Sequence, residues 1–244
     1  GKAAIRNNSL YYQTGITWTA ISSGNIGVRA FDFGFVFSNA GFCIFGNKSK
    51  KYILPLLNSK VGMHILRVLS PTMNYNVGDI ARIPIITRES EVPRIEATTA
   101  KSISLSRTDW DSFETSWDFK RHPLICGERT VAEAFVKWER EAAERFFTLK
   151  QNEEELNRIF IDIYGLQDEL TPEVEDKDVT LKTNTAYRYK KQKKKESNGD
   201  EFEEQEEIVE AEDIRRERFL HDSICELISY AVGCMFGRYS LDVE

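Results

Sequence analysis

The segment that most constrains the fold is residues 52–86, which reads YILPLLNSKVGMHILRVLSPTMNYNVGDIARIPII. Its apolar residues recur at helical spacing in two short runs, which Asn58-Ser59 separates and Pro71 ends. An Asn-Tyr-Asn turn then leads to Val77-Gly78-Asp79-Ile80 and to the strand-like Ile83-Pro84-Ile85. This punctuation predicts two small helices and a strand in one mixed α/β lobe.

Strand character precedes this segment. Apolar and polar residues alternate over 16–21 and again over 26–31, and a Ser-Ser-Gly-Asn turn separates the two runs. Phe42-Cys43-Ile44-Phe45 is a short apolar run after a second turn. We therefore predict that residues 1–101 form a small mixed α/β lobe.

The apolar period becomes helical from about Thr130. Asn152-x-x-Glu155 reads as a capping box that opens a further helix, and Gly165 closes that helix. A last helix is predicted from about Ile214. Residues 188–213 are rich in lysine and then in acidic residues, with few apolar ones, so a disordered charged loop is expected there. The predicted fold class is α+β, with a mainly helical region over 102–244.

Charge is distributed unevenly along the chain. Residues 1–101 contain twelve Lys or Arg and five Asp or Glu, a net charge of +7. Residues 102–244 contain 21 basic and 34 acidic residues, a net charge of −13. Because a basic surface attracts phosphate and an acidic one repels it, only the front region is expected to contact nucleic acid.

The sequence contains no recognisable catalytic motif. Adenine methylation of DNA uses a Pro-Pro-aromatic motif to grip the flipped base, and no Pro-Pro pair occurs in the chain. Gly24-x-x-Gly27 is too short for a cofactor loop, and His64, His122 and His221 lack a second ligand at helical spacing. No catalytic residue, metal site or cofactor is therefore predicted within these residues. The four cysteines are far apart, which is typical of reduced thiols in the cytoplasm, and no membrane span is expected.

DNA-binding groups are better represented than catalytic ones. Phosphate contacts are expected from basic residues on turns and helix ends, and base contacts from amides held between strands. For a single lysine a solvated face is an alternative, and for a single asparagine an ordinary turn role is an alternative. The candidate DNA-binding residues are Arg29, Lys48, Lys50, Lys51, Lys60, Arg67, Asn74 and Asn76, with Asn39 and Asn47 as further base-reading candidates.

Three blocks of the sequence resemble known DNA methyltransferases. Gly15-Ile16-Thr17-Trp18 and Leu56-Leu57-Asn58-Ser59-Lys60-Val61 are similar to segments of TaqI-like and type IIG restriction-modification enzymes. The run from Asp109 to Phe119 and the run from Ala231 to Tyr239 resemble the PglX-type adenine-specific DNA methyltransferases of BREX phage-defence systems.

The resemblance implies that this chain is part of a longer enzyme. In such enzymes a separate domain binds S-adenosylmethionine and methylates adenine, while a domain corresponding to residues 1–101 selects the site on double-stranded DNA. The chain opens at Gly1 without a methionine, so we expect flanking segments that hold the catalytic domain. Two alternatives remain open: a protein-interaction module of a defence complex, and a segment of a fused restriction endonuclease-methyltransferase.

Overall fold

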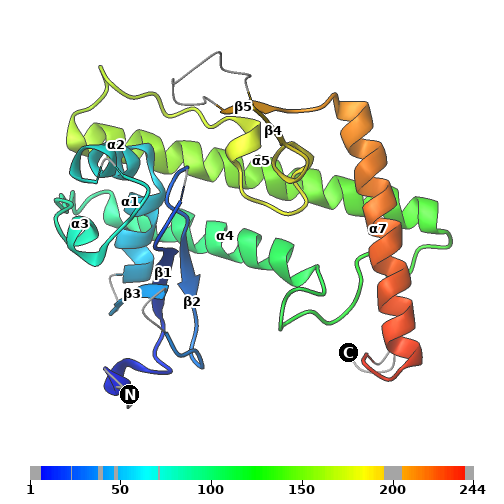
Figure 1. Cartoon of the computed structure of the whole chain (residues 1–244). Helices are drawn as coiled ribbons and strands as arrows, with labels where there is room; N and C mark the ends of the chain where they lie inside the picture. The colour runs from blue at the N-terminus through cyan, green and yellow to red at the C-terminus, as the bar shows by residue number, and fades with distance from the viewer. Residues whose placement is uncertain are drawn as a thin grey trace. The chain divides into compact units, whose positions relative to one another are not determined.

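The computed structural model describes residues 7–22, 24–37, 41–46, 49–70, 72–194 and 205–239 (Figure 1). The chain divides into two compact units. The front unit comprises Gly1–Ile103 together with Asn152–Glu173, and the back unit comprises Ser104–Gln151 together with Val174–Glu244. The front unit thus extends beyond the expected lobe at 1–101, because a segment from much later in the chain joins it.

The front unit contains a three-stranded antiparallel sheet in the order β2-β1-β3. The strands are β1 (Gly15–Thr19), β2 (Val28–Phe31) and β3 (Gly41–Phe45). All three coincide with runs in which alternation or apolar character predicted a strand. The side chain of Asn58 also holds β2, since its Oδ1 accepts a hydrogen bond from Val28 N at 3.0 Å and its Nδ2 donates to Val28 O at 2.9 Å.

Short helices follow the sheet. They are η1 (Asn8–Leu10), the π-helical η2 (Ser49–Ile53), α1 (Leu54–Asn58), α2 (Lys60–Leu69) and α3 (Val77–Ala81). The predicted break at Asn58-Ser59 is confirmed, because Ser59 caps α2 by accepting a hydrogen bond from Gly62 N. The predicted strand at 83–85 is wrong. Residues 83–85 are irregular, and they follow the short helix α3 at residues 77–81.

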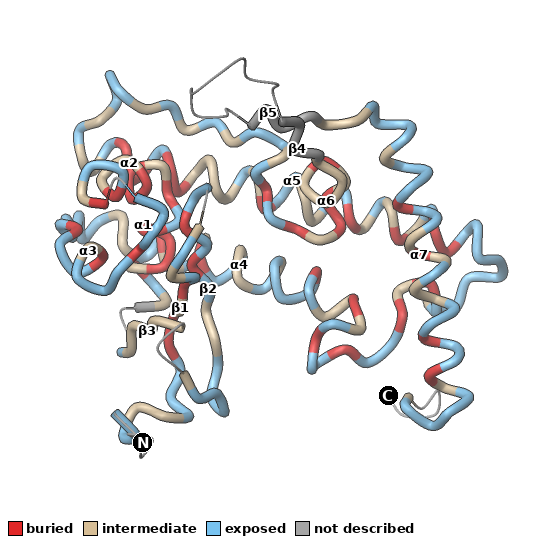
Figure 2. Tube along the Cα trace, in the orientation of Figure 1, coloured by how far each residue is buried: buried red, intermediate tan, exposed pale blue. Residues whose placement is uncertain are grey.

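The core of the front unit combines residues from both of its segments. Ile16 from the sheet, Leu57 and Leu66 from the short helices, and Ile95 are all buried. Phe160, from the later segment, is buried in the same cluster. Figure 2 shows buried residues in red along β1 and along α1 and α2. Such burial removes apolar surface from water and stabilises the unit.

Two long helices each contribute residues to both units. They are α4 (Val92–Asp111) and α5 (Val131–Tyr164), and Gly165 follows α5 with a positive φ of 68°. The predicted helix start at Asn152 is wrong, because α5 is continuous through that position. The capping box lies instead at the true start, where Thr130 N donates to Glu133 Oε2 and Glu133 N donates to Thr130 Oγ1.

Within the described residues, the back unit consists of helices, irregular segments and one antiparallel pair of strands. Its further elements are η3 (Asp176–Asp178), α6 (Thr185–Arg188), β4 (Lys191–Lys194), β5 (Gln205–Ile208) and α7 (Glu212–Met235). Its largest core contains Phe113, Phe135, Trp138 and Phe219. The pairing of β4 with β5 differs from the disordered loop expected over 188–213, although 195–204 lie outside the described residues. The register pairs residues 191–194 with residues 205–208 in antiparallel order.

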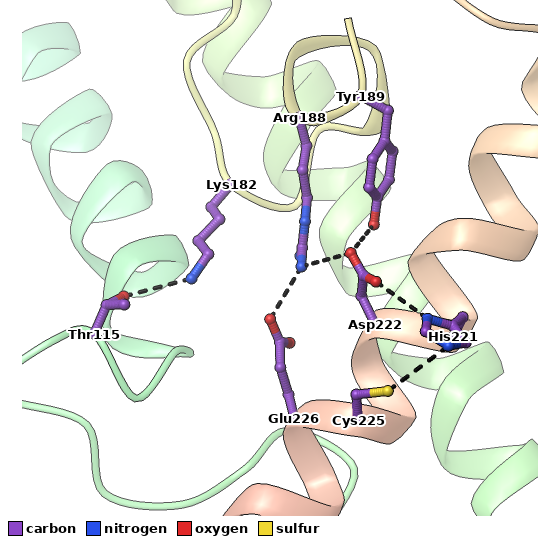
Figure 3. A network of polar contacts seen from close by, with 8 residues as sticks. All are labelled: Thr115, Lys182, Arg188, Tyr189, His221, Asp222, Cys225 and Glu226. Atoms are coloured by element: carbon purple, nitrogen blue, oxygen red, sulfur yellow. Dashed lines mark hydrogen bonds and ion pairs between the residues drawn. The ribbon is translucent and has the colours of Figure 1, made fainter.

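A polar network fixes α7 within the back unit (Figure 3). Arg188 Nη2 lies 3.0 Å from both Asp222 Oδ2 and Glu226 Oε1. Tyr189 OH donates to Asp222 Oδ2 at 2.9 Å, and burial together with the nearby carboxylates raises the tyrosine pKa. Because Arg188 is mostly buried, the network positions α7 by paired charges as well as by packing.

Candidate nucleic-acid interface

Three of the predicted phosphate-binding residues are on regular elements of the front unit. Arg29 is exposed on β2, opposite Thr17 of β1. Lys60 is the first residue of α2 and half-buried, and its backbone N–H donates to Asn157 Oδ1 at 2.9 Å. Arg67 is exposed in the last turn of α2. Among the described residues, neither Arg29 nor Arg67 forms an ion pair, so both remain available for a phosphate.

Two other predicted residues have acidic partners. Lys50 Nζ lies 2.8 Å from Asp32 Oδ1, and Lys51 Nζ lies 3.1 Å from Glu96 Oε2. Each pair is at least partly exposed, and exposed ion pairs contribute only about 0–1 kcal/mol. A phosphate could therefore compete for these lysines. Lys48, Asn39 and Asn47 lie outside the described residues.

The later segment of the front unit offsets much of the charge predicted for the lobe. Residues 152–173 contain seven acidic residues and one arginine, which leaves the unit a net charge of about +1. Arg88 pairs with Asp162, and Arg94 pairs with Glu155. The front unit therefore carries little net positive charge. Any phosphate contact would depend on individual basic residues that have no acidic partner.

The cations without partners include two that the sequence analysis did not select. Arg82, at the C-terminus of α3, and Lys101, on α4, are exposed and form no ion pair within the described residues. Arg82 and Arg67 lie on helices α3 and α2, which contact each other. Arg67 and Arg82, which form no ion pair within the described residues, flank residues 72–76, where Asn74 and Asn76 are exposed. We call this region the α2–α3 surface.

Hydrogen bonds hold the backbone of residues 73–75 in the α2–α3 surface. Ser22 N donates to Met73 O at 3.0 Å and Tyr75 N donates to Ala20 O at 2.8 Å, which joins the loop to the end of β1. Ser70 Oγ donates to Asn74 O at 2.7 Å. These bonds use main-chain groups and leave the side chain of Asn74 exposed.

Tyr75 anchors the same loop to the core of the front unit. Its side chain is buried, and Trp18 Nε1 donates to its carbonyl oxygen at 2.9 Å. The hydroxyl of Tyr75 donates to Gly24 O at 3.0 Å. The buried ring therefore holds the backbone between Asn74 and Asn76, whose side chains are both exposed.

Asn76 is positioned to cap α3 but forms no side-chain cap hydrogen bond. Its Nδ2 lies 3.5 Å from Asp79 Oδ2, which is long for a hydrogen bond. Its amide thus has unused donor and acceptor capacity. Asn74 and Asn76 are two residues apart on a fixed loop, and a planar amide held rigidly is the group that reads adenine.

Sequence reasoning missed Asn157, which supports this surface from 97 residues away. The side chain is buried, accepts a hydrogen bond from Lys60 N and donates to Pro172 O at 3.1 Å. It thereby fixes the start of α2. A local pattern does not reveal such a role, because the partners are distant in the sequence.

One grouping in the back unit has the residue types of a catalytic triad. Cys225 Sγ lies 3.8 Å from His221 Nε2, and His221 Nδ1 lies 3.3 Å from Asp222 Oδ1. Both Cys225 and His221 are exposed on α7, and Asp222 is already bound by Arg188 and Tyr189 (Figure 3). Nucleophilic catalysis needs a dry site with oxyanion donors, which an open helix surface does not provide. We assign this grouping a structural role.

The described residues contain no group of three or more His, Cys, Asp or Glu that could hold a metal ion. Within the same part of the chain, no helix has the length and apolar character needed to span a bilayer.

The fold and the α2–α3 surface define a two-unit α+β segment with an exposed polar loop. No family model matches the chain. It is 39% identical, over 97% of its length, to the adenine-specific methyltransferase PglX of Lacticaseibacillus casei (strain Zhang). It is 32% identical, over its whole length, to the adenine-specific methyltransferase BrxX of Escherichia coli O9:H4 (strain HS).

The chain spans 17% of the length of the first relative and 19% of the second. It is thus homologous to one segment of the PglX and BrxX adenine-specific methyltransferases, and the resemblance to PglX predicted from the sequence is confirmed.

Proposed function

We propose that the chain is the DNA-recognition segment of a PglX-type adenine-specific DNA methyltransferase. Methyl transfer from S-adenosylmethionine would take place in a part of the parent enzyme outside these 244 residues, since the sequence has no Pro-Pro pair and no glycine-rich cofactor loop. The segment would select the site and hold double-stranded DNA so that the target adenine reaches that active site.

The observation that carries this proposal is the fixed loop of the α2–α3 surface. Base reading requires donors and acceptors whose backbone does not move when DNA binds. Hydrogen bonds from Ser70 and Tyr75 hold the loop, while Asn74 and Asn76 keep exposed amides. We infer that these two amides contact base edges.

Phosphate anchoring would come from cations near this loop. Arg67 and Arg82 are on the two helices that flank it, and both are exposed and unpaired within the described residues. Arg29 and Lys60 would add contacts from β2 and the start of α2. Phosphate contacts of this kind fix the register of the protein on DNA without reading its sequence.

The anchoring role can be tested with the 244-residue chain and a labelled duplex, by measuring affinity as a function of salt. Arg67→Glu should weaken binding and make the dependence of log K on log salt shallower by about 1, because one phosphate contact is lost. Lys101→Glu makes the same charge change on α4 and should have a smaller effect. Equal effects of the two variants would show that the α2–α3 surface is not the anchor.

Base reading requires the full-length enzyme. Three host strains should be compared, which express the intact enzyme, its Asn74→Ala variant or its Asn76→Ala variant. In each strain, sequencing of the host DNA identifies the methylated motif. Loss of a bidentate contact costs about 1–3 kcal/mol of discrimination, so one position of the motif should become relaxed in at least one variant. An unchanged motif with both variants would contradict the assignment of these amides.

A second candidate function is a protein-interaction module in the back unit. On α7 the side chains of Ile228, Val232, Met235 and Phe236 are exposed by 58%, 44%, 83% and 84%. Their spacing places them along one helical stripe, which is a common docking surface for protein partners. If Met235→Ser with Phe236→Ser abolished a partner contact and left DNA affinity unchanged, that result would favour this function for the back unit.

A further inference from the structure

An exposed aromatic cluster lies at one end of the three-stranded sheet. Its rings make successive contacts: the centroids of Tyr11 and Phe37 are 5.1 Å apart, and those of Phe37 and Phe45 are 5.3 Å apart. Phe31 continues the series, at 6.0 Å from Phe45. Two outer pairs, Phe31–Phe35 and Tyr12–Phe33, complete the cluster at 6.3 Å and 6.5 Å.

The outer members of this cluster are exposed to solvent. Phe33 is 77% exposed, Phe35 57%, Val36 56% and Tyr12 52%. Full burial of a phenylalanine stabilises a protein by about 1.5–3 kcal/mol, so leaving several large apolar side chains in water forgoes a substantial stabilisation. Contiguous exposed apolar residues of this kind mark interaction sites.

The backbone of the outer cluster is fixed. Tyr12 N donates to Phe35 O at 2.9 Å, and Gly34 N donates to Tyr12 O at 3.4 Å. Tyr12 has a φ of 64°, in the left-handed region that residues other than glycine seldom adopt. Backbone held in such a conformation is typical of sites that bind something. The exposed rings are therefore presented in a defined arrangement.

The charge around the cluster favours a protein occupant over a nucleic acid. Between residues 7 and 47 the sequence contains one basic residue, Arg29, and one acidic residue, Asp32. Platforms that stack nucleic-acid bases combine aromatic rings with cations that hold the backbone. Close to the cluster the described cations are Arg29 and Lys50, and Asp32 already pairs with Lys50. Since few cations are left to hold a nucleic-acid backbone, the chemistry of the cluster fits the apolar surface of a protein better.

The area of the cluster favours an occupant within the same polypeptide over a second copy. Aromatic side chains present about 150–250 Å² each when fully exposed, so the exposed parts of these residues offer roughly 400 Å². A stable complex between separate proteins buries about 800 Å² on each partner. A segment of the same chain can dock on a smaller surface, because its effective concentration is high.

We propose that Tyr12, Phe33, Phe35 and Val36 form a docking face for an apolar surface of the parent methyltransferase outside these 244 residues. This inference rests on the proposed function, under which the chain is one part of a longer enzyme. The relatives that it matches are more than five times its length, so ample polypeptide exists to cover the face.

Hydroxyl-radical footprinting without DNA tests the proposal. Phe33 and Phe35 should be oxidised readily in the 244-residue chain and several-fold more slowly in the full-length enzyme at the same low concentration. Trp117, which is 98% exposed in the back unit, provides a reference for labelling efficiency within the chain. Equal labelling of the two phenylalanines in both proteins would overturn the proposal.

The double variant Phe33→Ser with Phe35→Ser separates the other occupants. In the 244-residue chain the variant should lower the unfolding midpoint only slightly, because both side chains are mostly exposed. In the full-length enzyme, protease should cleave these 244 residues from the rest of the protein faster than in the wild type. Dimerisation of the full-length enzyme that the variant abolishes would assign the face to a second copy instead. A several-fold loss of DNA affinity in the variant chain would assign it to base stacking.

These outcomes are distinct from failure of the proposed function. Footprinting uses no DNA, so protection of the phenylalanines does not depend on the anchoring role of Arg67. Conversely, normal DNA binding by a chain whose aromatic cluster stays unprotected in the full-length enzyme would overturn the docking face alone.

Discussion

Gly62 packs so closely against the preceding helix that a larger residue does not fit. A Cβ atom at this position would lie 2.2 Å from Leu56 O, which is backbone and cannot swing away. Gly62→Ala should therefore lower the free energy of unfolding by about 1–3 kcal/mol. The measurement is urea denaturation of the 244-residue chain, monitored by fluorescence of Trp18 and the other tryptophans.

Gly78→Ala is the matched control, because nothing lies within 4 Å of the corresponding Cβ on α3. Alanine favours a helix interior over glycine by up to about 1 kcal/mol, so the control should be neutral or slightly stabilising. Equal destabilisation by both substitutions would show that the contact of Gly62 with Leu56 does not govern this position.

His122 makes the stability of the back unit depend on pH. Burial lowers its pKa to about 4, and Glu114 opposes this shift only in part. The unfolded histidine has a pKa near 6.5, so the unfolded chain binds more protons between these values. Stability should be full above about pH 6.5 and should fall as the pH decreases toward 4, by at most about 3 kcal/mol from this group.

The contribution of His122 can be isolated with His122→Asn. The ring Nδ1 accepts a hydrogen bond from Leu124 N at 3.2 Å, and an asparagine oxygen can accept the same bond without titrating. The difference in unfolding midpoint between the wild type and the variant should change between pH 6.5 and 4. A difference that is constant over this range would refute the assignment.

At the scale of the element, the start of α5 depends on a reciprocal cap. Thr130→Ala removes the acceptor for Glu133 N and should cost about 1 kcal/mol. Thr130→Ser keeps the hydroxyl and should be close to the wild type. Thermal unfolding followed by circular dichroism measures both, and equal losses would show that the cap contributes nothing.

Several elements of the front unit could be predicted from local sequence patterns alone. Alternation over 16–21 and 26–31 predicted β1 and β2, because each strand has one buried side. The turn-like Asn58-Ser59 predicted the break between α1 and α2. Serine is a preferred N-cap residue, and Ser59 caps the first turn of α2.

Prediction failed where tertiary contacts outweighed local signals. Asn152 resembled a helix start, but α5 continues through it because apolar side chains on both sides pack into cores of the two units. Likewise, the charge pattern alone did not show that Arg88 and Arg94 would be paired by Asp162 and Glu155. For the candidate site, the sequence selected the exposed asparagines but not the hydrogen bonds that fix their loop.

At the scale of the whole molecule, the number of proposed phosphate anchors sets the expected salt dependence of DNA binding. If Arg29, Lys60, Arg67 and Arg82 each contact one phosphate, as proposed, they supply four phosphate contacts. Each contact adds about −0.9 to the slope of log K against log salt, so the slope should be no steeper than about −4. Anisotropy titrations of the 244-residue chain between low and physiological salt measure it. A slope of about −5 would indicate that Lys50 and Lys51 leave their acidic partners, and a slope of about −8 would show that further surfaces bind.

Because α5 contributes residues to both units, it limits how parts of this segment can be exchanged by recombination. Residues 152–164 of this helix complete the core around β1, while residues 131–151 belong with α7. A single genetic crossover near codon 101 would separate Ile16 and Leu57 from Phe160, which belongs to the same buried cluster. Exchange of the front unit between relatives therefore requires two coordinated breakpoints, or transfer of the entire region as one block.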